Sequence, residues 1–284
     1  MDSIYEFKLG NFDCAVVADG SRPDTIIETF PTVSAVDVSA AMRTIGYDTD
    51  DITVGFNLLT IDTGEKRILM DTGFGRGLLL ANLAKLDISP GDIDIIIITH
   101  GDGDHIGGMS QFPNAQFVLW QGAWDLWTDD DARTPMLQQL TTIFTGMTEE
   151  MLEKRAEYGR FTLPNLQEEN RLQLVQLEEE FLPGFQLIGA PGHRTDHVAV
   201  QIQSQDMTLL HIVDSMRHPV QIANPTWASY IDSFPDQLVD TNKQLLNRAA
   251  ETEAILFAAH MQFPALGCVI KTDDGFRWEK YESQ

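Results

Sequence analysis

The sequence of 284 residues contains little cysteine, few basic side chains and no long apolar run. Its two cysteines, Cys14 and Cys268, do not form a C-x-x-C pair of the kind that binds zinc or carries out redox chemistry. Each cysteine lies in an apolar, strand-like stretch. We therefore interpret both as reduced residues that pack in a core.

The shortage of apolar runs and basic residues excludes several classes of partner. No stretch approaches the roughly 20 apolar residues that span a bilayer, and the first residues lack the basic and apolar parts of a signal peptide. The chain has 19 basic and 43 acidic residues, a formal net charge of −24. Because phosphates are bound by clustered Lys and Arg, we expect no nucleic acid and no membrane partner. We expect a soluble, cytoplasmic protein with an acidic, solubilising surface.

The chain shows no internal repeat and no low-complexity linker, and 43% of its residues are hydrophobic. We therefore expect a single domain over residues 1–284. Apolar patterns predict strands in two similar halves, at residues 4–9, 14–18, 56–61, 67–71, 93–99 and 117–120, then from residue 172 at 186–190, 198–202, 209–213 and, as the last strand, 254–259. Helices are predicted at 78–86, from 124 to about 160, and at 234–250. The unbroken isoleucine run at 95–98 indicates a strand covered on both faces.

Potential metal ligands follow four of these buried strands. The seven residues are His100, Asp102, Asp104, His105, His193, Asp214 and His260. Loops at strand ends converge on ligands in layered α/β folds, and imidazole together with carboxylate suits zinc, iron or manganese. A lone histidine beside a strand is more often structural. The joint pattern nevertheless favours a metal centre.

At these positions the sequence resembles the metallo-β-lactamase superfamily. The family typically has H-x-H-x-D-H, and this chain has THGDGDHIGG at 99–108; it also has D-T-G at 71–73 and P-G-H at 191–193, while Asp214 lies in HIVDSMRH and His260 in AHMQFPALG. All five elements agree in order and spacing. The stretches FDCAVVADG, GDIDIIIITH and HMQFPALG resemble the branch of methyl parathion hydrolases and N-acyl homoserine lactonases. The resemblance implies a four-layer αβ/βα sandwich with a helical insertion, which we place at 124–171 near the active site.

The resemblance also implies two divalent metal ions, with zinc expected first. Site one would use His100 and His193. Site two would use Asp104, His105 and His260, with Asp214 bridging the two ions.

Asp102 departs from the family, because it stands where the motif has its second histidine. A carboxylate leaves site one with two imidazoles, so iron or manganese become alternatives there. In a second reading, Asp102 does not reach the metal and site one is weak or empty. Asp71 could also face Asp102, and two such carboxylates would need a cation or a shared proton between them.

The implied activity is hydrolysis of a small lactone or ester by a hydroxide held between the metals, with organophosphate or β-lactam cleavage as variants. Asp104 would orient the hydroxide and take up a proton. Arg217 would donate to a substrate oxyanion or bind a carboxylate, or it would be a surface arginine. Two alternatives from other classes are an iron-dependent redox enzyme that uses oxygen and a metal-binding module with weakened catalysis.

Several neighbouring residues have two readings. His197 is expected to contact ligands or pack, His211 to be structural, and His218 either to line the pocket or to have no role. The aromatic residues Trp120, Trp124, Trp127 and Phe144 would form a wall over the metals that favours an apolar or acyl-bearing substrate, or would only pack helices on the body. Family members are often dimers, so a homodimer is an alternative to a monomer.

Asp102 gives the sharpest sequence-based test. Changing Asp102→Ala should lower the metal bound at site one and reduce turnover by orders of magnitude, because a ligand is removed. Metal analysis and steady-state kinetics check both effects. Unchanged metal content and rate would show that Asp102 is not a ligand.

Overall fold

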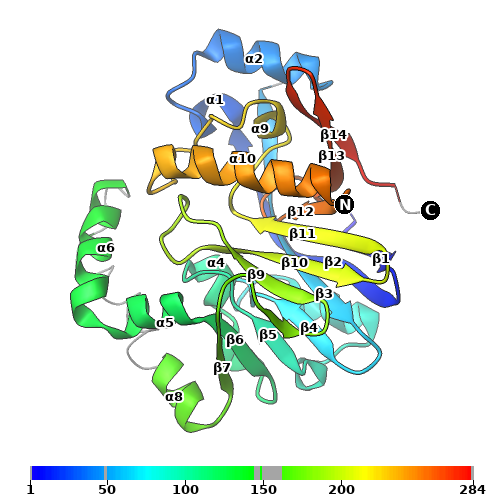
Figure 1. Cartoon of the computed structure of the whole chain (residues 1–284), viewed down its shortest axis with the longest axis vertical. Coiled ribbons are helices and arrows are strands. Elements are labelled where there is room, and N and C mark those ends of the chain that lie inside the picture. The colour runs from blue at the N-terminus through cyan, green and yellow to red at the C-terminus, as the bar shows by residue number, and fades with distance from the viewer. Residues whose placement is uncertain (1, 48–49, 144–147, 149–161, 283–284) are drawn as a thin grey trace.

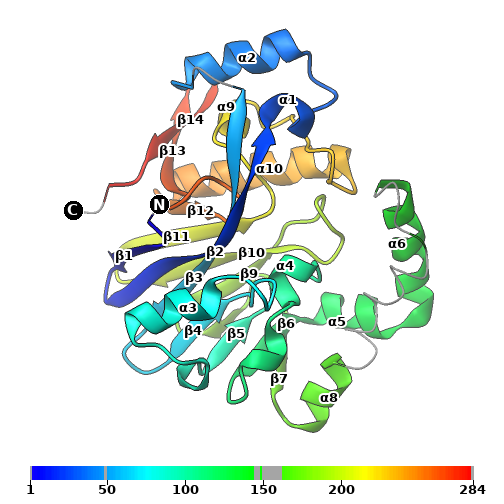
Figure 2. The ribbon, with the colours of Figure 1, turned by 180° about the vertical axis from the view of Figure 1, so that it is seen from behind.

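Two seven-stranded sheets pack against each other, and helices cover their outer faces (Figure 1, Figure 2). The computed structural model describes residues 2–47, 50–143, 148 and 162–282. The first sheet contains β1 Ile4–Leu9, β2 Phe12–Thr25, β3 Asp51–Asp62, β4 Arg67–Met70, β5 Ile95–Ile97, β6 Gln116–Trp120 and β7 Leu172–Val175. The second contains β8 Glu180–Leu182, β9 Phe185–Gly189, β10 Val198–Ser204, β11 Met207–Val213, β12 Ile255–Ala258, β13 Leu266–Thr272 and β14 Gly275–Lys280. This architecture confirms the predicted αβ/βα sandwich.

Both sheets are mixed. In the first sheet β1 to β4 pair antiparallel and β4 to β7 pair parallel, whereas in the second sheet β11 and β12 alone are a parallel pair. Parallel neighbours need crossover connections, and helices supply them. The helices are α1 Ile26–Thr29, α2 Ala35–Thr44, α3 Leu79–Leu83, α4 Gly103–Ile106, α5 Gln121–Thr128, α6 Asp130–Ile143, α8 Leu163–Glu168, α9 Val220–Ala223 and α10 Pro235–Glu251. None of the helices in the described segments is long and apolar enough to cross a membrane.

The isoleucine run of β5 shows how the layers are built. Ile95 and Ile97 belong to the apolar cluster between the sheets, while Ile96 and Ile98 belong to the cluster under the helices of the first sheet. Alternate side chains of a strand point to opposite faces, so a strand in the middle of the sandwich must be apolar throughout. The prediction of a strand buried on both faces is confirmed.

A third apolar cluster lies beside the two sheets, where α1 and α2 pack on the far ends of β2 and β3 (Figure 1). Its fully buried members include Ile26, Phe30, Val38 and Val220. The sequence analysis missed both helices, because α1 is a single turn and α2 carries exposed Val36 among its apolar positions. The available signal was the helix cap at Ser34, whose side chain accepts a hydrogen bond from the Asp37 amide.

Other boundaries also differ from the predictions. The strand at 254–259 is not the last, because β13 and β14 follow it as a hairpin around Asp273 and Asp274. The strand predicted at 14–18 extends over Phe12–Thr25, with a bulge between Ala18 and Gly20. In the described part of 124–160 the helical stretch is broken at Asp129, between α5 and α6. The single domain and the insertion at 124–171 stay predictions.

His218 links the third cluster to the acid stability of the fold. Its Nδ1 accepts a hydrogen bond from the Val220 amide at 3.1 Å, and its ring lies against Tyr47 with centroids 4.9 Å apart. Burial lowers the pKa of His218 from 6.5 to about 4. Between pH 6.5 and pH 4, His218 is therefore protonated in the unfolded chain but neutral in the folded chain. This contribution to stability is complete above pH 6.5 and is lost as the pH falls towards 4.

The variant His218→Asn tests this, because an amide oxygen accepts the Val220 hydrogen bond without titrating. The free energy of unfolding of both proteins should decrease between pH 6.5 and pH 4. The decrease should be smaller for the variant than for the wild type, with a difference on the order of 3 kcal/mol. Urea denaturation at several pH values measures the difference. Parallel pH profiles of the two proteins would contradict the assignment.

Candidate metal centre

Four loops meet at one end of the sandwich, and each follows a strand that the sequence marked. They follow β5, β9, β11 and β12, and together they carry all seven predicted ligands. Backbone hydrogen bonds tie the sheets together here. The Val198 amide donates to the Thr99 carbonyl at 3.1 Å, and the Gly55 amide donates to the His260 carbonyl at 3.1 Å. The parallel pairing of β11 and β12 places the loops that carry Asp214 and His260 at the same edge of the second sheet.

The residues predicted for site one lie together. His100, Asp102 and His193 each offer an atom within 4.8 Å of the other two. Asp102 Oδ2 is 3.8 Å from His100 Nε2 and 3.5 Å from His193 Nε2. Two ligands bound at 2.0–2.2 Å to one tetrahedral metal lie about 3.3–3.6 Å apart. The spacing therefore suits a metal ion among these three side chains.

Asp104, His105 and His260 form a second such group. Asp104 Oδ2 is 3.4 Å from His260 Nε2 and 3.7 Å from His105 Nε2. The carboxylate of Asp214 lies between the groups, with Oδ1 3.2 Å from His105 Nε2 and Oδ2 3.4 Å from His193 Nε2. This is the position that a bridging ligand requires.

The opposite ring nitrogen of each histidine is held by a partner. His105 Nδ1 is 2.7 Å from Asp71, His193 Nδ1 is 2.9 Å from Asp232, and His260 Nδ1 is 2.8 Å from the Gly55 carbonyl. His100 Nδ1 contacts the Thr99 hydroxyl at 3.2 Å. Such partners fix the tautomer that leaves Nε2 free as a ligand.

Four buried atoms facing the centre have no hydrogen-bond partner among the described residues. They are the Nε2 atoms of His100, His105 and His193 and the Oδ1 atom of Asp214. Buried polar atoms are normally satisfied, so a cluster of unpaired ones needs another partner. Imidazole nitrogen and carboxylate oxygen are the donors that zinc, iron and manganese accept. The donor set therefore fits metal ions.

The charges of the centre point the same way. Burial and the neighbouring His105 hold the pKa of His100 well below its usual value. Burial also acts to lower the pKa of His105, but the negative charges of Asp214 and Asp71 outweigh it and raise that pKa well above its usual value. Burial alone would raise the pKa of Asp214, yet the positive charges of His260 and His105 hold it well below. A bound cation can supply the positive charge that the protonated imidazoles provide to these carboxylates.

Asp71 does not face Asp102, which corrects one sequence-based expectation. Its carboxylate accepts hydrogen bonds from the Thr99 amide at 2.9 Å and the Thr99 hydroxyl at 2.8 Å, besides holding His105. The backbone of Asp71 is left-handed, with φ 61°, as is that of Val213 just before Asp214, with φ 53°. A β-branched residue rarely adopts this conformation, and such strain clusters at functional sites.

Arg194, which the sequence analysis did not consider, is the partner of Asp102. Its Nη2 is 2.7 Å from Asp102 Oδ2 and its Nε is 3.1 Å from Oδ1. The sequence offered one signal: an arginine directly follows the ligand candidate His193, in a chain whose motif has gained an acidic residue.

Arg217 is not a surface arginine. Its side chain is 7% exposed, and Nη2 donates to Asp214 Oδ2 at 2.7 Å. Two other residues behave as structural histidines: His197 accepts from the Asp214 amide at 3.2 Å, and His211 lies in β11 beside the Phe257 carbonyl. Both are buried, and burial lowers their pKa values, to about 3 for His197 and about 4 for His211.

Trp120, Trp124 and Trp127 pack on the body of the protein, which was the second of the two expectations, and none of them lines the cavity at the candidate metal centre. A cavity of about 170 Å³ opens at the metal centre, and its apolar lining comes from Val54, Phe56, Tyr230 and Ile231. Trp127 is buried in the core, and its Nε1 donates to Asp196 at 2.7 Å. Trp120 and Trp124 pack on the same core, and Phe144 lies outside the described residues. Sequence reasoning missed Arg22, Phe56 and Tyr230, because they come from segments far apart in the chain and only the fold brings them to the cavity.

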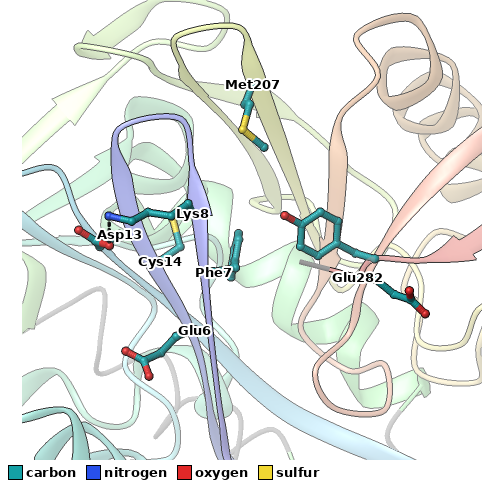
Figure 3. Close-up of a pocket in the computed structure, with 8 residues that line it drawn as sticks. Glu6, Phe7, Lys8, Asp13, Cys14, Met207 and Glu282 are labelled. Atoms are coloured by element: carbon teal, nitrogen blue, oxygen red, sulfur yellow. Dashed lines mark ion pairs between the residues drawn. The ribbon is translucent and has the colours of Figure 1, made fainter. Parts of the chain in front are cut away.

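A larger cavity, of about 570 Å³, lies away from the metal centre between the β1–β2 hairpin and the C-terminal residues (Figure 3). Lys8 and Asp13 form an ion pair at the hairpin, and Cys14 also lines this cavity. Burial raises the pKa of Cys14 to about 12, so its thiol stays protonated at neutral pH and is a poor nucleophile. Both cysteines are free thiols, as predicted.

Several known proteins are similar to this chain. The lactamase-like protein aptB of Emericella nidulans is 34% identical over 259 residues, which cover 83% of this chain and 71% of that protein. Metallo-beta-lactamase domain-containing protein 1 of Mus musculus is 43% identical over 54 residues, so the match spans only 18% of this chain and 21% of that relative.

Solved structures extend the similarity to the whole chain. The dizinc quorum-quenching lactonase AidC, solved with a product, has a TM-score of 0.85 and 25% identity and covers 99% of this chain and 98% of its own. The hydrolase AbOPH has a TM-score of 0.86 at 20% identity, with 100% and 99% coverage, which shows the shared fold. The family model described as the metallo-beta-lactamase superfamily matches residues 57–209, from β3 to β11, a range that includes His100, Asp104, His105 and His193. With Asp214 and His260 completing the same cluster from outside that range, the chain belongs to the metallo-beta-lactamase superfamily.

Proposed function

We propose that the chain hydrolyses a small lactone or ester at a two-metal centre formed by His100, Asp102 and His193 on one side, Asp104, His105 and His260 on the other, and Asp214 between them. The observation that carries this proposal is the set of unpaired, buried donor atoms around Asp214. The similarity to a lactonase solved with N-hexanoyl-L-homoserine supports the substrate class. Zinc is the metal we expect first.

Divalent cations in such a centre lower the pKa of a water towards neutrality and polarise the substrate carbonyl. The protein residues have separate tasks around that chemistry. The side chain of Asp104 is 20% exposed and lines the cavity, whereas that of Asp214 is 2% exposed. Asp104 can therefore exchange a proton with substrate or solvent, and we assign it the proton transfer to the leaving group.

Arg217 holds the Asp214 carboxylate and lines the same cavity. A fixed guanidinium beside a carbonyl oxygen that gains negative charge stabilises the transition state. We assign this role to Arg217. Val54, Phe56 and Ile231 supply an apolar surface, which favours an acyl-bearing substrate.

One reconstitution experiment tests the proposed reaction. Protein stripped of metal and reloaded with zinc, manganese or iron under nitrogen should bind two cations per chain and cleave lactones or aryl esters from a panel that also holds phosphotriesters and β-lactams. A redox enzyme would need iron and oxygen, so anaerobic turnover by the zinc form excludes that alternative. A chain that holds one cation and cleaves no member of the panel contradicts the proposal.

A second experiment tests the assignment of site one. Asp232→Asn weakens the acceptor that holds His193 Nδ1 at 2.9 Å, so the affinity for a cation at site one should fall about 10- to 100-fold, with site two unaffected. The matched control is Asp240→Asn, on the exposed face of α10. Titration against a chelating dye measures both affinities. Equal values for the two variants would remove His193 from the ligand set.

A further inference from the structure

Arg194 is fixed in place independently of Asp102. Its Nη1 donates to the His193 carbonyl at 2.6 Å, to the Ile231 carbonyl at 2.8 Å and to the Ser233 hydroxyl at 3.1 Å. The side chain is buried, with 3% of the residue exposed. A guanidinium held by three acceptors presents its remaining N–H groups in one direction, and that direction is towards Asp102.

Arg194 binds both carboxylate oxygens of Asp102, and one of them, Oδ2, also faces site one. Asp102 Oδ2 receives the 2.7 Å hydrogen bond from Arg194 Nη2 and also lies 3.5 Å from His193 Nε2. An ionised carboxylate has about four lone-pair positions, so one oxygen can accept from arginine and still ligate a cation. The two-point contact with Arg194 fixes the plane of the carboxylate and directs Oδ2 at the two imidazoles.

The pair also balances charge. An aspartate in place of an imidazole adds one negative charge to site one, and Arg194 adds one positive charge next to it in space. Two N–H groups of Arg194, on Nε and Nη2, donate to Oδ1 and Oδ2 of Asp102, and this two-point contact stabilises the ionised form of the carboxylate. The carboxylate therefore stays ionised and available as a ligand.

We propose that Asp102 and Arg194 form a single functional unit at site one, in which Arg194 orients the ligand oxygen of Asp102 and offsets its charge, so that the unit substitutes for one neutral ligand. This inference rests on the proposed two-metal centre. Arg194 is a positioning residue in it, because it acts on the cation through Asp102. The consequence is that the effects of substituting Asp102 and Arg194 on metal binding at site one depend on each other. Loss of Asp102 leaves a buried cation beside the metal, and only loss of Arg194 as well removes that repulsion.

A cycle of variants tests the coupling through cobalt(II) binding, followed by its stoichiometry and visible absorption rather than by turnover. The wild type should bind two equivalents. D102H should bind its first equivalent, at site two, like the wild type, and its second about tenfold or more weakly. D102H/R194Q should recover the second equivalent to within about threefold of the wild type, with an absorption spectrum changed by the new nitrogen ligand.

The matched control is D102H/R22Q. Arg22 lines the same cavity, but its ion pair is with Asp24. Removing this charge should not restore the second equivalent. If D102H binds two equivalents as tightly as the wild type, or R22Q restores binding as well as R194Q does, the pair is not a unit.

A second set of variants, with asparagine at residue 102, keeps the test valid if a histidine side chain does not fit at that position. D102N should lose the second equivalent and D102N/R194Q should regain part of it, while failure of R194Q to restore any binding overturns the inference. The wild-type titration distinguishes a failure of the two-metal centre from a failure of the Asp102–Arg194 unit. Fewer than two equivalents there would contradict the proposed two-metal centre, whereas two equivalents without coupling would contradict the Asp102–Arg194 unit alone.

Discussion

The buried charge of Asp214 is the constraint on which the site depends. Its carboxylate is 2% exposed and contacts side chains from three other loops and from its own loop. These partners are His105, His193, His260 and Arg217. A carboxylate removed from water costs several kcal/mol unless it is paired, so the loops can close only with these cationic or metal-binding groups around it. The strained backbone of Val213, with φ 53°, directly precedes Asp214, and its carbonyl accepts a hydrogen bond from the Ala259 amide at 3.0 Å.

The loop that carries His100 to His105 is held in position by Asp196 and Trp127. The Gly101 amide and Trp127 Nε1 both donate to one oxygen of Asp196, at 2.9 Å and 2.7 Å. The Trp127 ring occupies the space that a Cβ atom at residue 101 would need, which explains the glycine between His100 and Asp102. In the described part of the helical region, α5 therefore fixes the position of the ligands, while the apolar surface at the cavity comes from β3 and the loop that carries Tyr230 and Ile231.

The predictions succeeded where a signal is local in the sequence. The run at 95–98 could be identified as a central strand because a strand buried on both faces leaves no polar position. The seven ligand candidates could be found because they lie in the loops that follow predicted strands. The helices α1 and α2 and the hairpin of β13 and β14 were missed, since short elements stabilised by a neighbouring cluster carry weak periodicity of their own.

The sequence by itself determined many of the strands, the order of the ligand-bearing loops and the acidic exchange at residue 102, and the resemblance of its motifs to the superfamily implied the sandwich of two sheets. Hydrophobic periodicity and motif spacing are properties of neighbouring residues, so they can be found without a structure. The tertiary structure alone decided that Asp102 faces Arg194 and that Asp71 faces Thr99 and His105. It also decided that Trp127 is buried against Gly101, next to the ligand candidates. Such pairings join residues that are far apart in the chain. They form because an unpaired buried charge costs free energy, and which charges are buried is decided only by the packed fold.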